Sequence, residues 1–303
     1  MANTTFSGPV RSENGFKLTS KTASTGVVHD RTFGTPAKDA RRYYLEEYFS
    51  KKPGLNAVSI IDPDADSASA LAAYVIANRD FETLGTNYTT ALTTFAAHQA
   101  GILMTTATAD QDQGILLPHL DTNQTAWSGT KWGTENQVQW ECSIQAAQTD
   151  NEKIWAGLKL TNDQLIATDD DKIFFKYATD AGNGEALTTF ANWHVVHSIG
   201  GTDYISRLPI AFAADTPYHL KIVIDSDRKA TVFVNGIQYN LTSTSGSTGG
   251  TAVTAVQPGK AVVKSAALTN DVNLIPYIGI ENGDAAAAVL NVHYTAISRH
   301  VYE

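Results

Sequence analysis

Acidic side chains are the first residues to test for chemistry, because two carboxylates can cleave a glycosidic bond. Residues two positions apart on a strand face the same way, so such a pair could act as acid and nucleophile. Asp80 and Glu82 have this spacing, but we expect them at a helix end. Glu141 is the one acid on the polar side of its predicted strand, and Glu281 and Asp284 flank an Asn-Gly turn. We therefore predict no enzyme and assign no catalytic residue.

Histidines and serines offer little more. His194 and His197 are three residues apart, a spacing that would let both bind one metal if they lay on a helix. The β-branched and aromatic residues around them favour a strand, on which the two rings would face opposite sides. His219 and His293 stand on other predicted strands, and no Gly-x-Ser-x-Gly motif occurs. Each histidine is expected to be a surface residue or a satisfied core residue.

Alternating acids at Asp62, Asp64 and Asp66 are similar to the start of an EF-hand calcium loop. The sixth position of that loop holds Ser67 in place of glycine, and the twelfth holds Ala73 in place of glutamate. Helix capping and turn formation explain such acids without a metal. We predict no metal and no other cofactor, and leave open whether the three aspartates bind calcium.

Exposed aromatic side chains could form a platform for a sugar ring. The candidates are Trp127, Trp132, Trp155 and Trp193, whereas Trp140 falls in phase with residues expected in the core. Trp155 is out of phase with the apolar residues of its strand, so we expect it to face solvent or a partner. Contact with a sheet, an arm or another subunit is favoured over contact with a ligand. Nucleotide-binding glycine motifs do not occur.

Composition argues against several classes of partner. The 303 residues carry 22 Lys+Arg and 31 Asp+Glu, a net charge of −9, so nucleic acid is not expected as a partner. No apolar run reaches the roughly 20 residues that span a bilayer, and the first residues are polar. We therefore expect no membrane partner and synthesis in a cytoplasm. The single cysteine, Cys142, cannot form an intramolecular disulfide and is expected to be buried.

Three predicted regions must position these residues. Residues 1–40 are rich in Thr, Ser, Gly and Asn, and we expect an extended arm that becomes ordered only against a neighbour. Residues 41–89 are expected to form a linker with two short helices, because apolar residues recur at helical spacing in 39–54 and in 62–85. Residues 90–303 carry apolar residues at every second position and predict an antiparallel β-sandwich.

Individual strands of the sandwich can be placed. Residues 137–146 alternate between apolar and polar, which predicts a half-buried strand. Residues 218–240 predict three strands in a meander, turning at 225–228 and at Asn235-Gly236, a pair that adopts the positive φ values of a type I′ turn. Further strands are expected at 154–160, 172–178, 192–199 and 290–297; in the last, Leu290, Val292, Tyr294 and Ala296 should share a face.

Two family resemblances add to this prediction. Residues 215–239 and 290–303 resemble concanavalin A-like, laminin-G-like jelly rolls, which implies a jelly-roll sandwich from about residue 90. Short stretches at 1–17, 106–118, 137–146, 151–161 and 192–204 resemble virion structural proteins of tailed bacteriophages, of the capsid-decoration or cement type.

The second resemblance implies a decoration protein that binds and stabilises the assembled head through residues 1–40 and through oligomerisation. The implied partners are the major capsid protein or another virion protein and further copies of the chain, with a trimer favoured, and the implied location is the virion. The alternative is a glycan-binding module of a fibre or head appendage used in host adhesion, with a host surface glycan as partner.

Overall fold

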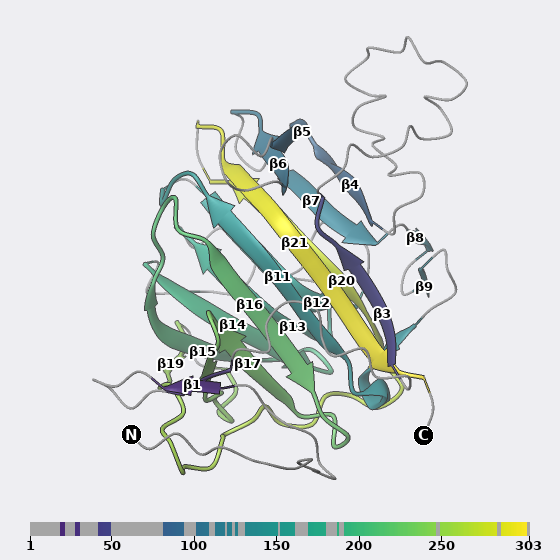
Figure 1. Cartoon of the computed structure of the whole chain (residues 1–303), viewed down its shortest axis with the longest axis vertical. Helices are drawn as coiled ribbons and strands as arrows, with labels where there is room; N and C mark the ends of the chain where they lie inside the picture. Colours follow the sequence, from purple (N-terminus) through teal and green to yellow (C-terminus); the bar gives the residue numbers. More distant parts are fainter. Residues whose placement is uncertain are drawn as a thin grey trace, which may run out of the picture.

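Two sheets, antiparallel except for the pairing of one short edge strand, form the body of the protein in a computed structural model (Figure 1). The structure describes residues 19–21, 28–30, 42–49, 81–93, 101–108, 113–118, 120–122, 125–126, 131–150, 152–160, 169–179, 187, 191–246, 249–283 and 286–301. This described part contains strands almost throughout, so the predicted mainly β jelly-roll sandwich is confirmed as the fold class.

The first sheet has ten strands in the described part. Its order is β1 (Thr19–Lys21), β2 (Val28–Asp30), β18 (Ile237–Tyr239), β17 (Ala230–Val234), β16 (Tyr218–Ile224), β11 (Gln139–Ala146), β21 (Val289–His300), β6 (Gly101–Thr106) and β5 (Tyr88–Thr93), with β3 (Arg42–Glu47) also paired with β21.

The second sheet has nine strands in the same described part. Its order is β19 (Thr251–Ala252), β15 (Thr202–Ala211), β14 (Asn192–Ile199), β13 (Lys172–Ala178), β12 (Glu152–Lys159), β20 (Asn273–Asn282), β7 (Gln113–Pro118) and β4 (Phe81–Thr86), with β10 (Trp132–Gly133) also paired with β20. A short pair, β8 (Leu120–Thr122) and β9 (Thr125–Ala126), and one turn of 3-10 helix, η2 (Thr134–Asn136), complete the elements.

Alternating side chains of the two sheets meet in one core. The predicted set on β11 is buried, including Trp140 and Cys142, and Ile154, Ala156 and Leu158 of β12 pack into the same cluster. Rings of Tyr177, Trp193, Phe212 and Tyr218 lie against one another between the sheets. Each large side chain removed from water in this way contributes roughly 1.5–3 kcal/mol, so the sandwich needs no disulfide.

The helix expected in residues 39–54 is wrong, because residues 42–47 form strand β3. Figure 1 shows β3 (purple) running beside β21 (yellow), and the register pairs Leu45 with Ile297. Leu45 and Phe49 are buried in the core. The spacing of the apolar residues fits a helix as well as a strand, and the backbone hydrogen bonds that β21 offers decide the outcome in favour of the strand.

The rest of the predicted arm and linker is described only in part. Residues 19–21 and 28–30 form β1 and β2, and β2 extends the ten-stranded sheet through the pairing of His29 with Ile237. Of the second expected helix, residues 62–80 lie outside the described residues and 81–85 belong to strand β4. The predicted division into an arm, a linker and a sandwich stays a prediction. Among the described residues there is no long apolar helix of the kind that spans a bilayer.

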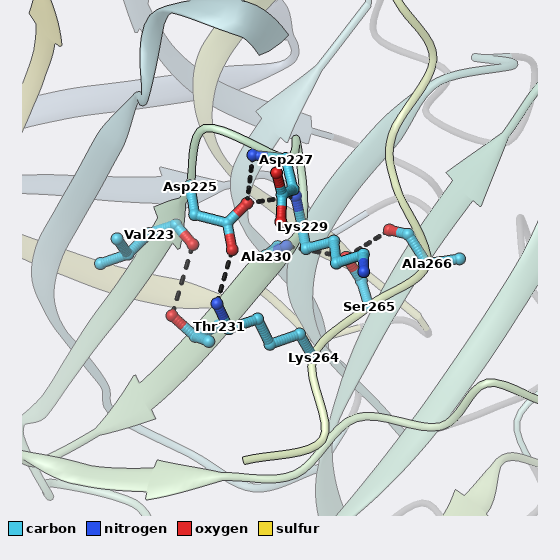
Figure 2. A network of polar contacts seen from close by, with 9 residues as sticks. All are labelled: Val223, Asp225, Asp227, Lys229, Ala230, Thr231, Lys264, Ser265 and Ala266. Carbon is cyan, nitrogen blue, oxygen red and sulfur yellow. Dashed lines mark hydrogen bonds and ion pairs between the residues drawn. The ribbon is translucent and has the colours of Figure 1, made fainter. Parts of the chain in front are cut away.

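The predicted meander at 218–240 is confirmed. Asn235 and Gly236 have φ values of 48° and 80°, as a type I′ turn requires, and they join β17 to β18. Figure 2 shows the preceding turn, in which the carboxylate of Asp225 accepts hydrogen bonds from the backbone amides of Asp227 and Lys229 and from the ammonium of Lys264. One acidic side chain therefore holds the turn closed.

Strand β21 departs from the predicted alternation at its centre. Its pairing with β11 shifts between Ser143 and Ile144, which marks a β-bulge. Leu290 and Val292 point into the core as predicted, but after the bulge Ile297 does so, and Tyr294 turns to the other side to donate a hydrogen bond to Glu141. The shared face predicted for Tyr294 and Ala296 with Leu290 is therefore wrong.

Candidate functional site

The candidate site is the outer face of the nine-stranded sheet, the side turned away from the core. On the central strands, every second side chain points to this side, and these side chains combine cations with aromatic and aliphatic groups. They are Lys153, Trp155 and Lys159 of β12; Lys172, Phe174 and Lys176 of β13; His194, Val196 and Ser198 of β14; Asp203, Ile205 and Arg207 of β15; and Tyr277 and Glu281 of β20.

Strand register brings four of these residues into one line, which we call the cationic row. Trp155 lies opposite Lys176, Lys176 opposite His194, and His194 opposite Arg207. Adjacent strands are about 4.8 Å apart, so the row spans about 14 Å across four strands. The Lys176 ammonium lies 5.7 Å from the centre of the Trp155 ring, a cation–π distance. The row therefore joins an aromatic ring, an imidazole and two cations.

The other lysines of the outer face each lie near a carboxylate. Lys153 Nζ is 2.9 Å from Glu281 Oε1, Lys159 Nζ is 3.6 Å from Asp169 Oδ2, and Lys172 Nζ is 3.7 Å from Asp203 Oδ1. The three lysines are only 1–2% exposed. An ammonium this deeply buried depends on its partner, because removing one member of a buried pair leaves an uncompensated charge.

Aromatic rings lie among these charges and form a second apolar cluster. Trp155, Phe174 and Tyr277 pack with Val196 and Ile205 on the outer face. Position 279 must be a glycine here, because a Cβ on it would lie 2.7 Å from Cε1 of Tyr277. The Tyr277 ring can therefore lie along the sheet, where the Lys159 ammonium sits 4.6 Å from its centre. Rings and cations are fixed against each other.

His194 is the member of the row whose chemistry the structure defines most fully. Its Nδ1 lies 2.9 Å from the carbonyl oxygen of Asn192, so Nδ1 carries the proton and donates it. Its Nε2 then carries a lone pair, and among the described residues it has no hydrogen-bond partner. The pKa of His194 is lowered to about 4, mainly by burial; the charges of Arg207 and Lys176 act in the same direction, and the hydrogen bond to Asn192 acts against them. His194 is therefore a neutral acceptor at pH 7.

Access to the outer face is uneven. Lys176 and His194 are almost fully buried, whereas Arg207 and Asp203 on β15 are partly exposed. Strand β15 has only the two-residue β19 beyond it in the sheet. Strand β19 pairs with β15 at Ser206 and Arg207, and a Cβ at Gly250 would lie 3.3 Å from Cδ2 of His194, so this end of the face is covered by the chain that precedes and forms β19.

Several predicted site residues lie elsewhere. Trp132 and Trp193 are buried in the core, so neither is a surface platform. The expectation that Trp155 faces solvent is wrong, because it is 5% exposed and packs with Leu187 in the second apolar cluster. His194 and His197 face opposite sides of β14, as predicted, and His197 stacks on Tyr204. Trp127, Asp62, Asp64, Asp66, Asp80 and Asp284 lie outside the described residues. Within the described part, no three His, Cys, Asp or Glu side chains gather as a metal site would require.

Three acidic residues differ from their predicted settings. Glu82 belongs to strand β4 and not to a helix end. Glu281 lies within β20 and not in a turn, and its carboxylate holds Lys153. Glu141 is buried, so the predicted half-exposed polar side of β11 is wrong at this position. Its carboxylate accepts a 2.6 Å hydrogen bond from Tyr294 and lies 3.5 Å from the Lys221 ammonium.

The cationic row has a signature in the sequence that the search for catalytic motifs missed. On β12 and β13, lysines and aromatic residues occupy the positions that alternate with the core residues, as in Lys153, Trp155 and Lys159. A lysine on the second face of a central strand is unusual, because lysine is almost never fully buried without a partner. The order of these residues across neighbouring strands depends on the strand register, which cannot be read from a single sequence.

No protein-family model matches the chain, and no curated protein matches its sequence. Solved structures with a similar fold exist. A protein of unknown function from Shewanella oneidensis MR-1 has a TM-score of 0.46 at 10% identity, covering 86% of this chain and 87% of its own. A β-glucanase from Bacillus licheniformis has a TM-score of 0.44 at 9% identity, covering 84% and 97%.

The exoplasmic/lumenal domain of VIP36, in a form bound to Ca²⁺ and Man3GlcNAc, has a TM-score of 0.40 at 10% identity, covering 74% of this chain and 84% of its own. At these identities the likeness concerns the fold alone. The choice between catalysis and binding rests on the site itself.

Proposed function

We propose that the protein binds glycans on the outer face of its nine-stranded sheet. Sugar sites combine an apolar platform with a few fixed polar groups that set orientation. Trp155 and Tyr277 supply rings, Lys176 and Arg207 are the cations, and His194 supplies an acceptor. All but Arg207 are at most 5% exposed, so binding requires the segments that cover this face to move aside. The observation that carries the proposal is the cationic row, in which ring, cations and acceptor follow one another on four adjacent strands.

Binding is favoured over glycosidic hydrolysis because Asp169, Asp203 and Glu281 each lie within 4 Å of a lysine. Glu281 and Asp203 lie on β20 and β15, which are four strand spacings apart in the sheet. This corresponds to about 19 Å, whereas the paired carboxyls of glycosidases are about 5 to 9.5 Å apart. The expectation that the chain is not an enzyme stays a prediction.

The proposal adopts the glycan-binding part of the alternative derived from the sequence. The role in capsid decoration, the trimer and the location in a virion stay predictions, because neither the described residues nor the similar structures test them.

A glycan microarray tests the proposed function. The full chain should bind at least one class of glycan, and Trp155→Leu should lose that binding, because leucine keeps the apolar bulk but removes the ring. Phe233→Leu is the matched control: Phe233 is equally buried, but on the outer face of the ten-stranded sheet. Near-UV circular dichroism checks that both variants fold. A folded wild-type chain that binds no glycan, or a Trp155→Leu variant that binds unchanged, contradicts the proposal.

A further inference from the structure

One end of the sandwich carries two connections that pass between the sheets. Residues 147–151 lead from β11 of the ten-stranded sheet to β12 of the nine-stranded sheet, and residues 212–217 lead back from β15 to β16. The amide of Asp215 in the second connection donates a 2.8 Å hydrogen bond to the carbonyl oxygen of Ala146, where the first connection begins. The two connections are therefore joined to each other at this end of the core.

Tyrosines from two strands hold these connections against the core. The Tyr177 hydroxyl of β13 donates a hydrogen bond to the carbonyl oxygen of Thr149, and the Tyr177 ring stacks on Phe212 with 4.0 Å between ring centres. The Tyr218 hydroxyl of β16 accepts a 2.8 Å hydrogen bond from the amide of Ala213. Each connection is thus fixed by a tyrosine hydroxyl that contacts its backbone.

Glu152 begins β12 at the same end of the core, and its carboxyl group has no compensation there. It lies in phase with the core residue Ile154 and is 0% exposed, and neither carboxyl oxygen has a hydrogen-bond partner in the described part of the chain. The two connections contain no lysine, arginine or histidine. The adjacent Lys153 pairs with Glu281 on the outer face. An ionised carboxylate would be costly in this setting, so the neutral acid is favoured.

The groups around Glu152 are acidic or neutral. Burial raises the pKa of the Glu152 carboxyl to about 9, and the charge of Asp150 in the first connection acts in the same direction. Burial also raises the pKa of Tyr177, to about 12, and that of Tyr218, so both hydroxyls are neutral at pH 7. Asn282 of β20, opposite Glu152 in the sheet, carries no charge. These neighbours do not stabilise an ionised Glu152.

We propose that Glu152 is a proton-operated latch for this end of the sandwich. With its proton bound, the carboxyl stays in the core and both connections remain closed. When the connections open, water reaches the carboxyl, which then ionises at its ordinary pKa of 4.5. Between that value and the raised value of the closed state, each pH unit favours opening about tenfold. Acid therefore closes this end, and neutral pH loosens it.

Carbon-13 NMR of the glutamate side chains tests the protonation on which the latch depends. The variant Glu152→Gln keeps the shape of the side chain and is neutral at every pH. At pH 7 the wild-type chain should show a glutamate δ-carbon with the chemical shift of a protonated carboxyl, and Glu152→Gln should lack that signal. Identical signals from protonated carboxyls in the two proteins, or none in either, overturn the proposal.

Hydrogen exchange measured by NMR tests the opening itself. Four backbone amides in the two connections are hydrogen-bonded in the closed state: Ala147, Phe212, Ala213 and Asp215. Wild type and Glu152→Gln are compared at the same pH, so that the intrinsic pH dependence of exchange cancels. The ratio of their opening constants should rise about hundredfold from pH 5.5 to pH 7.5.

Two controls place the opening at this end and at this residue. After correction for intrinsic rates, the four amides of the wild-type chain should exchange faster than amides in the middle of β11. Asp227→Asn removes an exposed carboxylate from the turn at the opposite end of β16, and its exchange should follow the wild type. Near-UV circular dichroism checks that both variants fold.

Three results would overturn the latch. A ratio that does not change with pH would show that Glu152 has the same acidity in the closed and open states. Equal opening constants for the four amides and for β11 would show that this end opens only when the whole sandwich unfolds. Slower opening of the wild type, but not of Glu152→Gln, on adding CaCl₂ or KCl in place of choline chloride would show that a cation, and not a proton, neutralises the carboxyl.

Discussion

The outer faces of the two sheets both bury charged side chains, but they do so differently. On the ten-stranded sheet, the Glu141 carboxylate accepts a hydrogen bond from Tyr294 with one oxygen and faces the Lys221 ammonium with the other. This cluster matches one acid with one cation. On the nine-stranded sheet, cations outnumber the described acids, and aromatic rings stand between them. Burial of charge alone therefore does not identify a site; the order of ring, cation and imidazole acceptor along one line of register distinguishes the nine-stranded sheet.

Breaking the ion pair between Lys153 and Glu281 on the nine-stranded sheet should give the largest change in stability. Glu281→Gln leaves the Lys153 ammonium, which is 2% exposed, without the carboxylate 2.9 Å away. We expect the free energy of unfolding to fall by about 3 kcal/mol or more, measured by urea denaturation at pH 7. The double variant Lys153→Met/Glu281→Met should recover much of this loss. A single variant as stable as the wild type would show that the pair is not buried as described.

The contribution of His194 to the stability of the nine-stranded sheet depends on pH. Its ordinary pKa is 6.5, and burial lowers it to about 4 in the folded protein. Between these pH values the unfolded chain binds a proton on His194 that the folded chain does not. Its contribution to stability is therefore complete above pH 6.5 and falls by about 3 kcal/mol as the pH drops towards 4.

The variant His194→Asn isolates this effect. Urea unfolding of the variant and the wild type at pH 7 and at pH 4.5 gives the difference, which should shrink by about 2 to 3 kcal/mol at the lower pH. Burial also raises the pKa of Glu152, to about 9, which makes stability fall as the pH rises above 4.5, but this acts on both proteins alike. A difference that does not change with pH would contradict the buried, neutral imidazole.

A substitution on the outer face of the ten-stranded sheet should give the smallest change in stability and no change in glycan binding. Glu141→Gln keeps an oxygen that accepts the Tyr294 hydrogen bond but removes the charge opposite Lys221. We expect a loss of about 1 to 2 kcal/mol in the free energy of unfolding and an unchanged affinity for the glycan that the wild-type chain binds. Loss of glycan binding in this variant, with the fold intact, would move the site to the ten-stranded face.

Local sequence patterns predict the parts of the fold that local physics decides. The alternation around Trp140 predicts β11, and the Asn235-Gly236 pair predicts its turn, because both depend on neighbours in the chain. Strand β3 is mistaken for a helix because its apolar spacing suits both, and pairing with β21 across the sequence decides between them. The bulge in β21 inverts the side on which Tyr294 lies, and no local pattern marks it.

The candidate site is predictable in its residues but not in its arrangement. The sequence shows that Trp155 alternates with the core residues of its strand. It also shows that His194 and His197, three residues apart on a strand, face opposite sides. The placement of Lys176 between Trp155 and His194 follows from the order of β12, β13 and β14 and from their register. Both are set by contacts between distant segments, which is why motif spacing along the chain does not reveal the row.

Hydrogen–deuterium exchange with and without a saturating glycan identified on the microarray tests most directly whether the outer face of the nine-stranded sheet is the ligand face. The account predicts slower exchange in residues 192–211, which span β14 and β15, and unchanged exchange in residues 218–234, which span β16 and β17 of the other sheet. Slower exchange confined to residues 218–234, or no change in either segment under conditions where binding is measured, would contradict it.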